Sequence, residues 1–119
     1  MTLDASLKKA HGAYYTPACV ADFLASWAVR CGNDVVLDPS AGAGVFLFSA
    51  HAVLRNLGGR SSQQLIGIEL LSSTYAQTDA DLRSGGVGAR LVRKNFFEVT
   101  PSDLGLVDVV IGNPPFIRY

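Results

Sequence analysis

The stretch VVLDPSAGAGVFL, residues 35–47, decides how this chain folds. It opens with a short, wholly apolar run that is typical of a buried strand and that ends at Asp38. Small residues follow, with Gly42 and Gly44 placed where a backbone can pass close to a ligand because no Cβ intrudes. The next residues, Val45–Asn56, predict a helix that a pair of glycines terminates. A strand, a glycine loop and a helix in this order are typical of nucleotide-binding loops.

The loop fits neither of the common phosphate-binding patterns. No Gly-Lys-Ser/Thr follows it, which argues against a P-loop, and Leu47 stands where a dinucleotide-binding loop has its third glycine. Asp38 lies at the strand tip and faces the mouth of the loop, where a carboxylate repels phosphate and attracts a cation. The two glycines taken alone are also compatible with a simple tight turn, so the neighbouring strands must decide.

The strand and helix pattern repeats along the chain. Strands are predicted at residues 65–70, 89–92 and 106–111, with a helix over residues 72–83. Strands and helices that alternate at this spacing indicate parallel βαβ units with right-handed crossovers. The predicted fold class is therefore α/β, with an open parallel sheet.

Another helix is predicted before the first strand. Thr16 is expected to cap its N-terminus, with Pro17 at the first helical position and the end at residues 31–32. Four large apolar residues share one face of this helix: Val20, Phe23, Leu24 and Trp27. We expect this stripe to be the buried face.

Polar residues stand at the end of every predicted strand. They are Asp38, Glu69, Asn95 and the segment 113–116. Because the carboxyl ends of parallel strands meet at one edge, where ligands bind, we expect these residues to share one site. Asp38 suits an ammonium group and Glu69 suits the hydroxyls of a ribose, and S-adenosylmethionine carries both groups without a phosphate. Either acid alone is also compatible with a helix N-cap.

The end of the third strand suits an adenine ring. Asn95 offers an amide for the edge of the base, and Phe96 offers an aromatic face for stacking. The alternative is a polar residue followed by phenylalanines in the core, at Phe96 and Phe97.

The segment NPPF, residues 113–116, suits methylation of an amino group on an aromatic base. Such a nitrogen is a poor nucleophile because its lone pair is delocalised into the ring. The Asn113 side-chain oxygen and the Pro114 main-chain oxygen can accept hydrogen bonds from both N–H groups and so localise the pair. Pro114 and Pro115 stiffen the loop, and Phe116 offers a face for an extruded base. The alternative is a Pro-Pro turn with Phe116 in the core.

Composition limits the partners of the chain. Ten Lys and Arg balance ten Asp and Glu, so the net charge is zero, whereas a nucleic-acid-binding surface is normally basic. If nucleic acid is bound, most of the contact surface is expected outside this chain. Cys19 and Cys31 are expected to be reduced core residues, and no metal-ligand spacing is present. We predict a cytoplasmic protein, since no apolar run approaches about 18 residues and no signal peptide is seen.

Five motifs in order make the sequence resemble the gamma-class adenine-N6 DNA methyltransferases of restriction-modification and phage-defence systems. They are GAYYTP at 12–17, DPSAGAGVFL at 38–47, GIEL at 67–70, NFF at 95–97 and NPPF at 113–116. The NFF position more often begins with Asp in that family. NPPF alone is shared with RNA and protein-glutamine methyltransferases, whereas the ordered set is far more specific.

The resemblance implies a Rossmann-like class I S-adenosylmethionine-dependent methyltransferase fold, with its strands in the order third, second, first, fourth. The residues that it assigns to the cofactor are Tyr15, Thr16, Asp38, Ser40, Gly42, Gly44, Phe46, Glu69, Asn95 and Phe96. The residues that it assigns to the flipped adenine are Asn113, Pro114, Pro115 and Phe116. The implied enzyme is a site-specific, adenine-specific DNA methyltransferase of a type I, II or IIG modification system.

Members of that family continue beyond a fourth strand with further strands and a target-recognition domain. We therefore expect this chain to be the N-terminal half of a catalytic domain, truncated after its fourth strand, with residues 1–12 flexible. The fourth strand would then be an exposed edge that favours a homodimer. DNA and a restriction or specificity subunit are the other implied partners. The alternatives are an RNA or protein-glutamine methyltransferase with the same loop, and a cofactor-binding module that is inactive in isolation.

Overall fold

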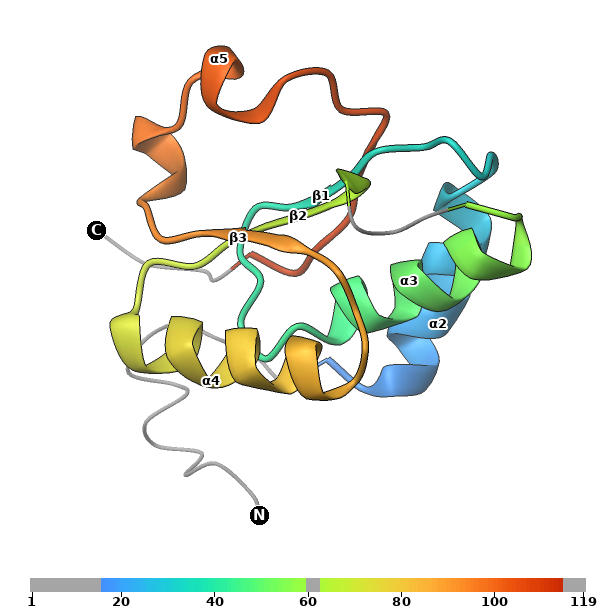
Figure 1. Ribbon diagram of the computed structural model, residues 1–119, viewed down its shortest axis with the longest axis horizontal. Helices are drawn as coiled ribbons and strands as arrows, with labels where there is room; N and C mark the ends of the chain where they lie inside the picture. Colours follow the sequence, from blue (N-terminus) through green and yellow to red (C-terminus); the bar gives the residue numbers. More distant parts are fainter. Residues whose placement is uncertain (1–15, 60–62, 115–119) are drawn as a thin grey trace.

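The fold is built on a parallel sheet, seen in a computed structural model that describes residues 16–59 and 63–114. Its strands are β1 (Val36–Asp38), β2 (Leu65–Ile68), β3 (Arg90–Val92) and β4 (Val109–Val110). They lie in the order β3-β2-β1-β4, and every neighbouring pair is parallel (Figure 1). The predicted α/β class and strand order are confirmed. The expectation for residues 1–12 lies outside the described residues.

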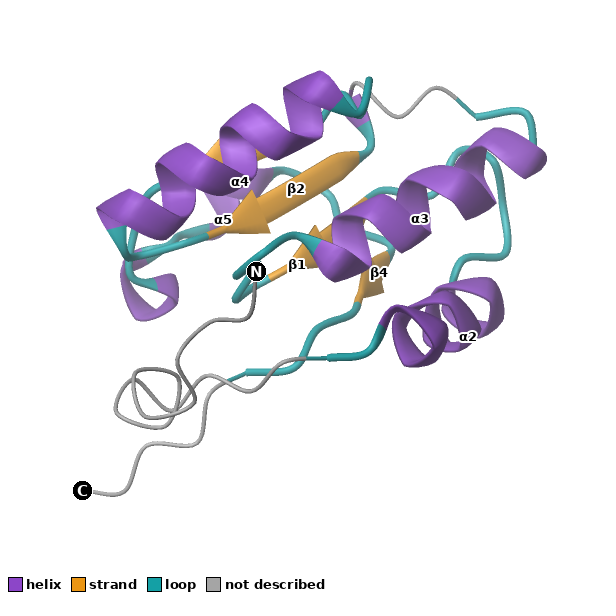
Figure 2. Cartoon of the chain, turned by 90° about the horizontal axis from the view of Figure 1, so that it is seen from below, coloured by secondary structure: helices purple, strands orange, loops and turns teal. Residues whose placement is uncertain are grey.

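Helices and a looped segment cover opposite faces of the sheet. The helices α2 (Ala18–Ala28), α3 (Val45–Asn56) and α4 (Ser72–Ser84) lie on one side, and α5 (Pro101–Leu104) lies on the other (Figures 1 and 2). Successive strand residues alternate between these faces, as the pleat requires. Val36 and Leu65 pack against the helices, whereas Leu37, Ile66 and Ile68 pack against the segment that contains α5.

Helix α3 lies at the centre of the larger core. Its Leu47, Ala50 and Leu54 are fully buried, and its bounds agree with the prediction from the glycines on either side. Gly67 of β2 allows α3 to approach the sheet, because a Cβ there would lie 2.8 Å from Leu47 Cδ1. The helix that follows the glycine loop is therefore held firmly against the strands that carry the polar edge.

The predicted buried stripe of α2 is wrong. Phe23 and Trp27 are 69% and 67% exposed, and Val20 and Leu24 are also exposed. The buried face instead carries Ala21 and Ala25, and Ser49 of α3 donates a hydrogen bond of 2.6 Å to Asp22. Small side chains let two helices approach closely, so the alanines face α3 and the larger apolar residues point outward.

The cap and the end of α2 also differ from the prediction. Pro17 occupies the N-cap position, no side chain caps the helix, and the last helical residue is Ala28. Cys19 and Cys31 are free but exposed, so the expectation that they lie in the core is wrong. Cys19 lies on the helix surface with the large apolar residues, and Cys31 lies in the turn after the helix has ended.

A short helical segment after β3 was not predicted. It comprises the 3₁₀-helix η2 (Phe96–Glu98) and α5, which begins with a capping box between Thr100 and Asp103. The sequence signal is the run Thr-Pro-Ser-Asp at residues 100–103, which places a cap, a proline at the first position and an acid at the third. Within the described ranges, no helix is long and apolar enough to span a membrane.

The packing of α2 makes opposite predictions for its two faces. Ala25→Leu is expected to lower the free energy of unfolding by about 1–3 kcal/mol, because the added atoms have no space against α3. Trp27→Ala is expected to change it by less than about 0.5 kcal/mol, because the ring is exposed. Urea denaturation followed by circular dichroism measures both. A larger loss of unfolding free energy in Trp27→Ala than in Ala25→Leu would contradict this arrangement and would indicate that the large apolar stripe is the buried face.

Candidate cofactor and base-binding site

The predicted polar edge exists. Parallel pairing places Asp38 beside Gly67, so the end of β1 and the end of β2, followed by Glu69, lie at the same edge. Ile111 donates to the Leu37 carbonyl oxygen at 2.9 Å, which brings the segment after β4 to the same place. The glycine loop, Glu69 and Asn113 therefore come from three chain segments that meet at one end of the sheet.

Asp38 is the buried charge of this edge. Its side chain is fully buried, and its Oδ1 accepts a hydrogen bond of 3.0 Å from the Ser40 main-chain N–H. Burial raises the pKa of Asp38 from 3.8 to about 7, because it removes water from the carboxylate, and the nearby charge of Glu69 adds to the increase. Its Oδ2 and the Ser40 hydroxyl have no hydrogen-bond partner within residues 16–59 and 63–114. Asp38 thus retains an unused acceptor beside the loop.

The segment that begins the predicted catalytic loop packs directly against Asp38. A Cβ at Gly112 would lie 2.6 Å from Asp38 Oδ1, so only glycine allows this approach. The side-chain nitrogen of Asn113 donates to the Thr16 hydroxyl at 3.1 Å. In this assignment of the amide, the nitrogen serves as the donor and the side-chain oxygen of Asn113 stays available as an acceptor.

Glu69 fixes the loop while retaining acceptor capacity. Its Oε1 accepts from the Gly42 main-chain N–H at 3.0 Å, and its Oε2 accepts from the Leu71 N–H at 2.8 Å. Leu71 is the N-cap of α4, so Glu69 binds the start of this helix, which is part of what the alternative of a capping role predicted. Each carboxylate oxygen has a second lone pair, so these bonds do not prevent it from accepting further hydrogen bonds from ribose hydroxyls.

The end of β3 places Asn95 at a local cap. Its side-chain oxygen accepts from the Phe97 N–H at 3.0 Å and begins η2. Phe96 is 44% exposed and Phe97 is 89% exposed, so the alternative that these rings lie in the core is wrong. Their ring centres lie 6.2 Å apart in an edge-to-face arrangement.

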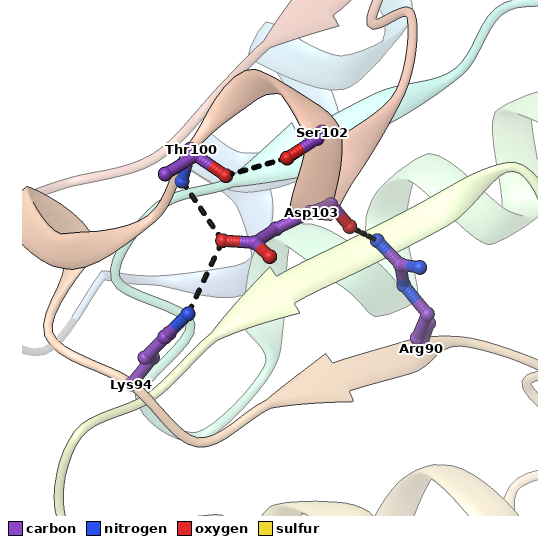
Figure 3. Close-up of polar contacts among 5 residues, drawn as sticks. All are labelled: Arg90, Lys94, Thr100, Ser102 and Asp103. Carbon is purple, nitrogen blue, oxygen red and sulfur yellow. Dashed lines mark hydrogen bonds and ion pairs between the residues drawn. The ribbon is translucent and has the colours of Figure 1, made fainter.

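A polar cluster holds the chain that follows Asn95 (Figure 3). The Asp103 carboxylate accepts from the Thr100 N–H at 2.9 Å and from the Lys94 ammonium at 3.2 Å. The Thr100 N–H, followed by Lys94, lowers the pKa of Asp103. Arg90 donates to the main-chain oxygen of Asp103. This cluster ties β3 to α5 and so supports the exposed segment that carries Asn95 and Phe96.

The remaining assigned residues fall into two groups. Phe46 lies in the hydrophobic core under the loop, at 3% exposure, and Pro114 is exposed at the end of the described chain. Tyr15, Pro115 and Phe116 lie outside the described residues. Among the described residues, no group of three His, Cys, Asp or Glu is placed to hold a metal ion.

Thr78 of α4 contributes to this site but was not predicted from the sequence. This side chain is 1% exposed, and its hydroxyl donates to the Gly42 main-chain oxygen at 2.5 Å. The available signal was weak, because a single threonine in a polar helix usually faces solvent. The one available indication is that Thr78 lies one helical turn before Leu82, so the two residues share a helix face, and Leu82 is also buried.

Similarity to known proteins extends over nearly the whole chain. A family model described as N-6 DNA Methylase matches residues 2–119. The chain belongs to this family. The resemblance drawn from the five motifs is therefore confirmed.

Relatives with assigned roles are much longer than this chain. The type II methyltransferase M.XamI from Xanthomonas campestris pv. amaranthicola is 27% identical over 111 residues, which cover 91% of this chain and 20% of the relative. The chain thus spans about one fifth of the length of that relative.

Solved structures with the same fold are methyltransferases or modification subunits. The modification subunit of a putative type I restriction enzyme from Vibrio vulnificus YJ016 superposes with a TM-score of 0.72 at 26% identity, over 93% of this chain and 26% of that one. An RNA methyltransferase from Salinibacter ruber, in complex with S-adenosyl-L-homocysteine, gives a TM-score of 0.65 at 24% identity, over 83% of this chain and 60% of that one. The Rossmann-like methyltransferase fold is confirmed.

The buried carboxyl of Asp38 predicts that stability depends on pH. An unfolded chain loses this proton near pH 4, whereas the folded chain keeps it up to about pH 7. The folded state therefore binds more protons in that interval, and the free energy of unfolding falls as the pH rises through it. Asp38→Asn cannot titrate, so the difference in unfolding free energy between the wild type and this variant isolates the effect of Asp38.

Urea denaturation at several pH values measures this difference. We expect the wild type to lose unfolding free energy relative to Asp38→Asn steadily as the pH rises from about 4.5 to about 7.5. A difference that stays constant over this range would show that Asp38 is ionised throughout, and it would contradict the raised pKa.

Proposed function

We propose that this chain forms the cofactor pocket and catalytic loop of an S-adenosylmethionine-dependent adenine-N6 DNA methyltransferase. The observation that carries the proposal is the position of Asp38, which lies buried between the glycine loop and Gly112 with one oxygen unpartnered among the described residues. Membership of the N-6 DNA methylase family supports the reaction class. The activity of the whole protein is part of this proposal, because the chain spans only about one fifth of M.XamI.

The side chains at this edge fit a cationic nucleoside better than a phosphate. Asp38 supplies a desolvated acceptor for the ammonium group, and Glu69 supplies acceptors for ribose hydroxyls. Gly42 and Gly44 have φ angles of +53° and +85°, and a Cβ at Gly42 would have only the Ser40 oxygen near it, at 4.0 Å, so a ligand can approach the backbone closely at Gly42. When bound, the cofactor would supply an electrophilic methyl group on a sulfonium.

The other assigned residues complete the cofactor set. Ser40 lies beside Asp38 with its hydroxyl unpartnered among the described residues, and Thr16 holds the Asn113 amide. We place Asn95 and Phe96 at the adenine ring, since Phe96 is partly exposed at the same edge. Tyr15 and Phe46 enter the proposal through the family motifs that they occupy.

Asn113 and its neighbours would act on the target base. The Thr16 hydroxyl fixes the amide nitrogen of Asn113, so the amide oxygen is oriented before a substrate arrives. This oxygen and the Pro114 carbonyl would accept hydrogen bonds from the N6 amino group. Held by these two acceptors, the nitrogen would direct its lone pair toward the methyl group that a bound cofactor would supply. Pro115 and Phe116 are assigned to the flipped base by the motif.

DNA and a restriction or specificity subunit are the proposed partners. The related structure from Vibrio vulnificus is named as a modification subunit of a restriction enzyme, which supports an assembly of that kind. The relatives named above come from bacteria, whose DNA lies in the cytoplasm, so a cytoplasmic location is part of the proposal. The neutral net charge indicates that most DNA contacts come from outside this chain.

Three alternatives receive less support. An RNA methyltransferase shares the fold at 24% identity, a likeness that concerns the fold alone. A protein-glutamine methyltransferase would share the NPPF loop. A cofactor-binding module without activity of its own is the third possibility for this chain in isolation.

Calorimetric titration with S-adenosylmethionine and tritium transfer to DNA, RNA and release-factor protein test the proposal together. We expect the chain to bind the cofactor more tightly at pH 8 than at pH 6, because the ionised form of Asp38 binds the ammonium. Asp38→Asn should weaken binding at least tenfold and remove most of this pH dependence, while the surface variant Asp79→Asn should match the wild type. Asn113→Ala should leave cofactor affinity within about twofold and abolish transfer to DNA.

Each result has a distinct meaning. Transfer to RNA or protein in place of DNA would favour the corresponding alternative, and binding without any transfer would favour the cofactor-binding module. No binding at either pH would overturn the proposal.

We further propose that the chain associates through β4. Among the strands of residues 16–59 and 63–114, β4 lies at the edge of the sheet, and Val110 is 65% exposed. The N–H groups of Val109 and Ile111 point to β1, so the strand alternation directs that of Val110 outward. An open edge of this kind can pair with a second copy.

Light scattering over a concentration series measures this association. The wild type is expected to approach the mass of a dimer as its concentration rises, and Val110→Lys is expected to stay monomeric because it places a charge at the edge. A wild type that remains monomeric at high concentration would refute the pairing.

A further inference from the structure

The backbone of Gly42 is held at both its N–H and its carbonyl by the segment that contains β2 and α4. On one side Glu69, just after β2, accepts from the Gly42 N–H at 3.0 Å. On the other side Thr78, from the middle of α4, donates its hydroxyl proton to the Gly42 oxygen at 2.5 Å. Gly42 has a φ of +53°, in the left-handed region. Both polar groups of a residue in an uncommon conformation are therefore satisfied by side chains.

The methyl group of Thr78 contacts the second loop glycine. A Cβ at Gly44 would lie 3.1 Å from Thr78 Cγ2, so the methyl group lies close to the Gly44 backbone. Gly44 has a φ of +85° and is the N-cap of α3. The two branches of one threonine thus act on the two glycines of the loop, the hydroxyl on Gly42 and the methyl on Gly44.

We infer that Thr78 is a positioning residue for the cofactor, which it serves by fixing the glycine loop in its binding conformation. This inference rests on the proposed function of the loop. Thr78 itself is 1% exposed and lies in the helix layer beneath the loop, so its effect passes through Gly42 and Gly44.

The physical reason is the cost of ordering a glycine-rich loop. Glycine loses more conformational freedom than any other residue when it is fixed, and a loop that is fixed before binding avoids this loss at the moment of binding. Without the Thr78 hydroxyl, the Gly42 carbonyl would lose its partner and the loop would sample other conformations. Affinity for the cofactor would then fall although no contact to the cofactor had been removed.

Two substitutions separate the branches of Thr78. Thr78→Val keeps the shape and the methyl contact but removes the hydrogen bond, whereas Thr78→Ser keeps the hydroxyl and removes the methyl group. Ser73→Ala, at an exposed position of the same helix, is the matched control. If the valine variant does not fold, Thr78→Ala removes the same hydrogen bond without a buried branched side chain.

The first readout is the dissociation constant of S-adenosylmethionine, measured by calorimetry at a temperature where every variant is folded. Thr78→Val is expected to bind about tenfold more weakly, while Thr78→Ser stays within about threefold of the wild type and Ser73→Ala is unchanged. A role in stability alone would lower the melting temperature of the valine variant without changing this constant. Equal affinity of the folded valine variant and the wild type would overturn the inference.

The second readout is amide hydrogen exchange of residues 40–46 without any ligand. Exchange of the Gly42 and Gly44 amides that is faster in Thr78→Val than in the wild type, and that returns to the wild-type rate in Thr78→Ser, supports the positioning role. Unchanged exchange overturns it. If the wild type fails to bind the cofactor, the proposed function fails, and the exchange rates alone then decide whether Thr78 positions the loop.

Discussion

The arrangement of this site depends on burying a carboxylate where three chain segments meet. Asp38 ends the central strand β1, caps the first turn of the glycine loop through Ser40 and lies against Gly112. A buried carboxyl with an unused oxygen is costly to maintain in a small core, because burial disfavours the ionised form and raises the pKa of Asp38 to about 7. The ammonium group of the proposed cofactor gives a reason to keep a carboxyl group at this point.

Around Asp38, side chains hold the polar groups of the site in place through hydrogen bonds. Glu69 and Thr78 fix the main-chain N–H and carbonyl of Gly42, and Thr16 fixes the side-chain amide of Asn113. Each of these bonds joins different elements of the fold, so the glycine loop and the segment after β4 are oriented by tertiary structure. The geometry of the site therefore depends on all the elements that meet at this edge of the sheet, although few of their atoms would contact a ligand.

Much of this architecture could be read from the sequence, and the exceptions have physical causes. The bounds of α3 were predicted correctly because glycines mark both of its ends, and the strand order was predicted through the family motifs. The buried face of α2 was not, because hydrophobic size favoured Phe23 and Trp27 while close helix packing selects Ala21 and Ala25. Contacts such as Asn113 to Thr16 join residues far apart in the chain and leave no periodic signal.

The outward position of Trp27 has a spectroscopic consequence. It is the single tryptophan of the chain and is 67% exposed, so its fluorescence emission is expected near the red-shifted maximum of an indole in water. Global denaturation will therefore change the wavelength of its emission maximum little. A blue shift of the Trp27 emission while the protein stays folded would instead show that another surface has covered α2. Trp27 can therefore report the binding of a partner to this helix without an added label.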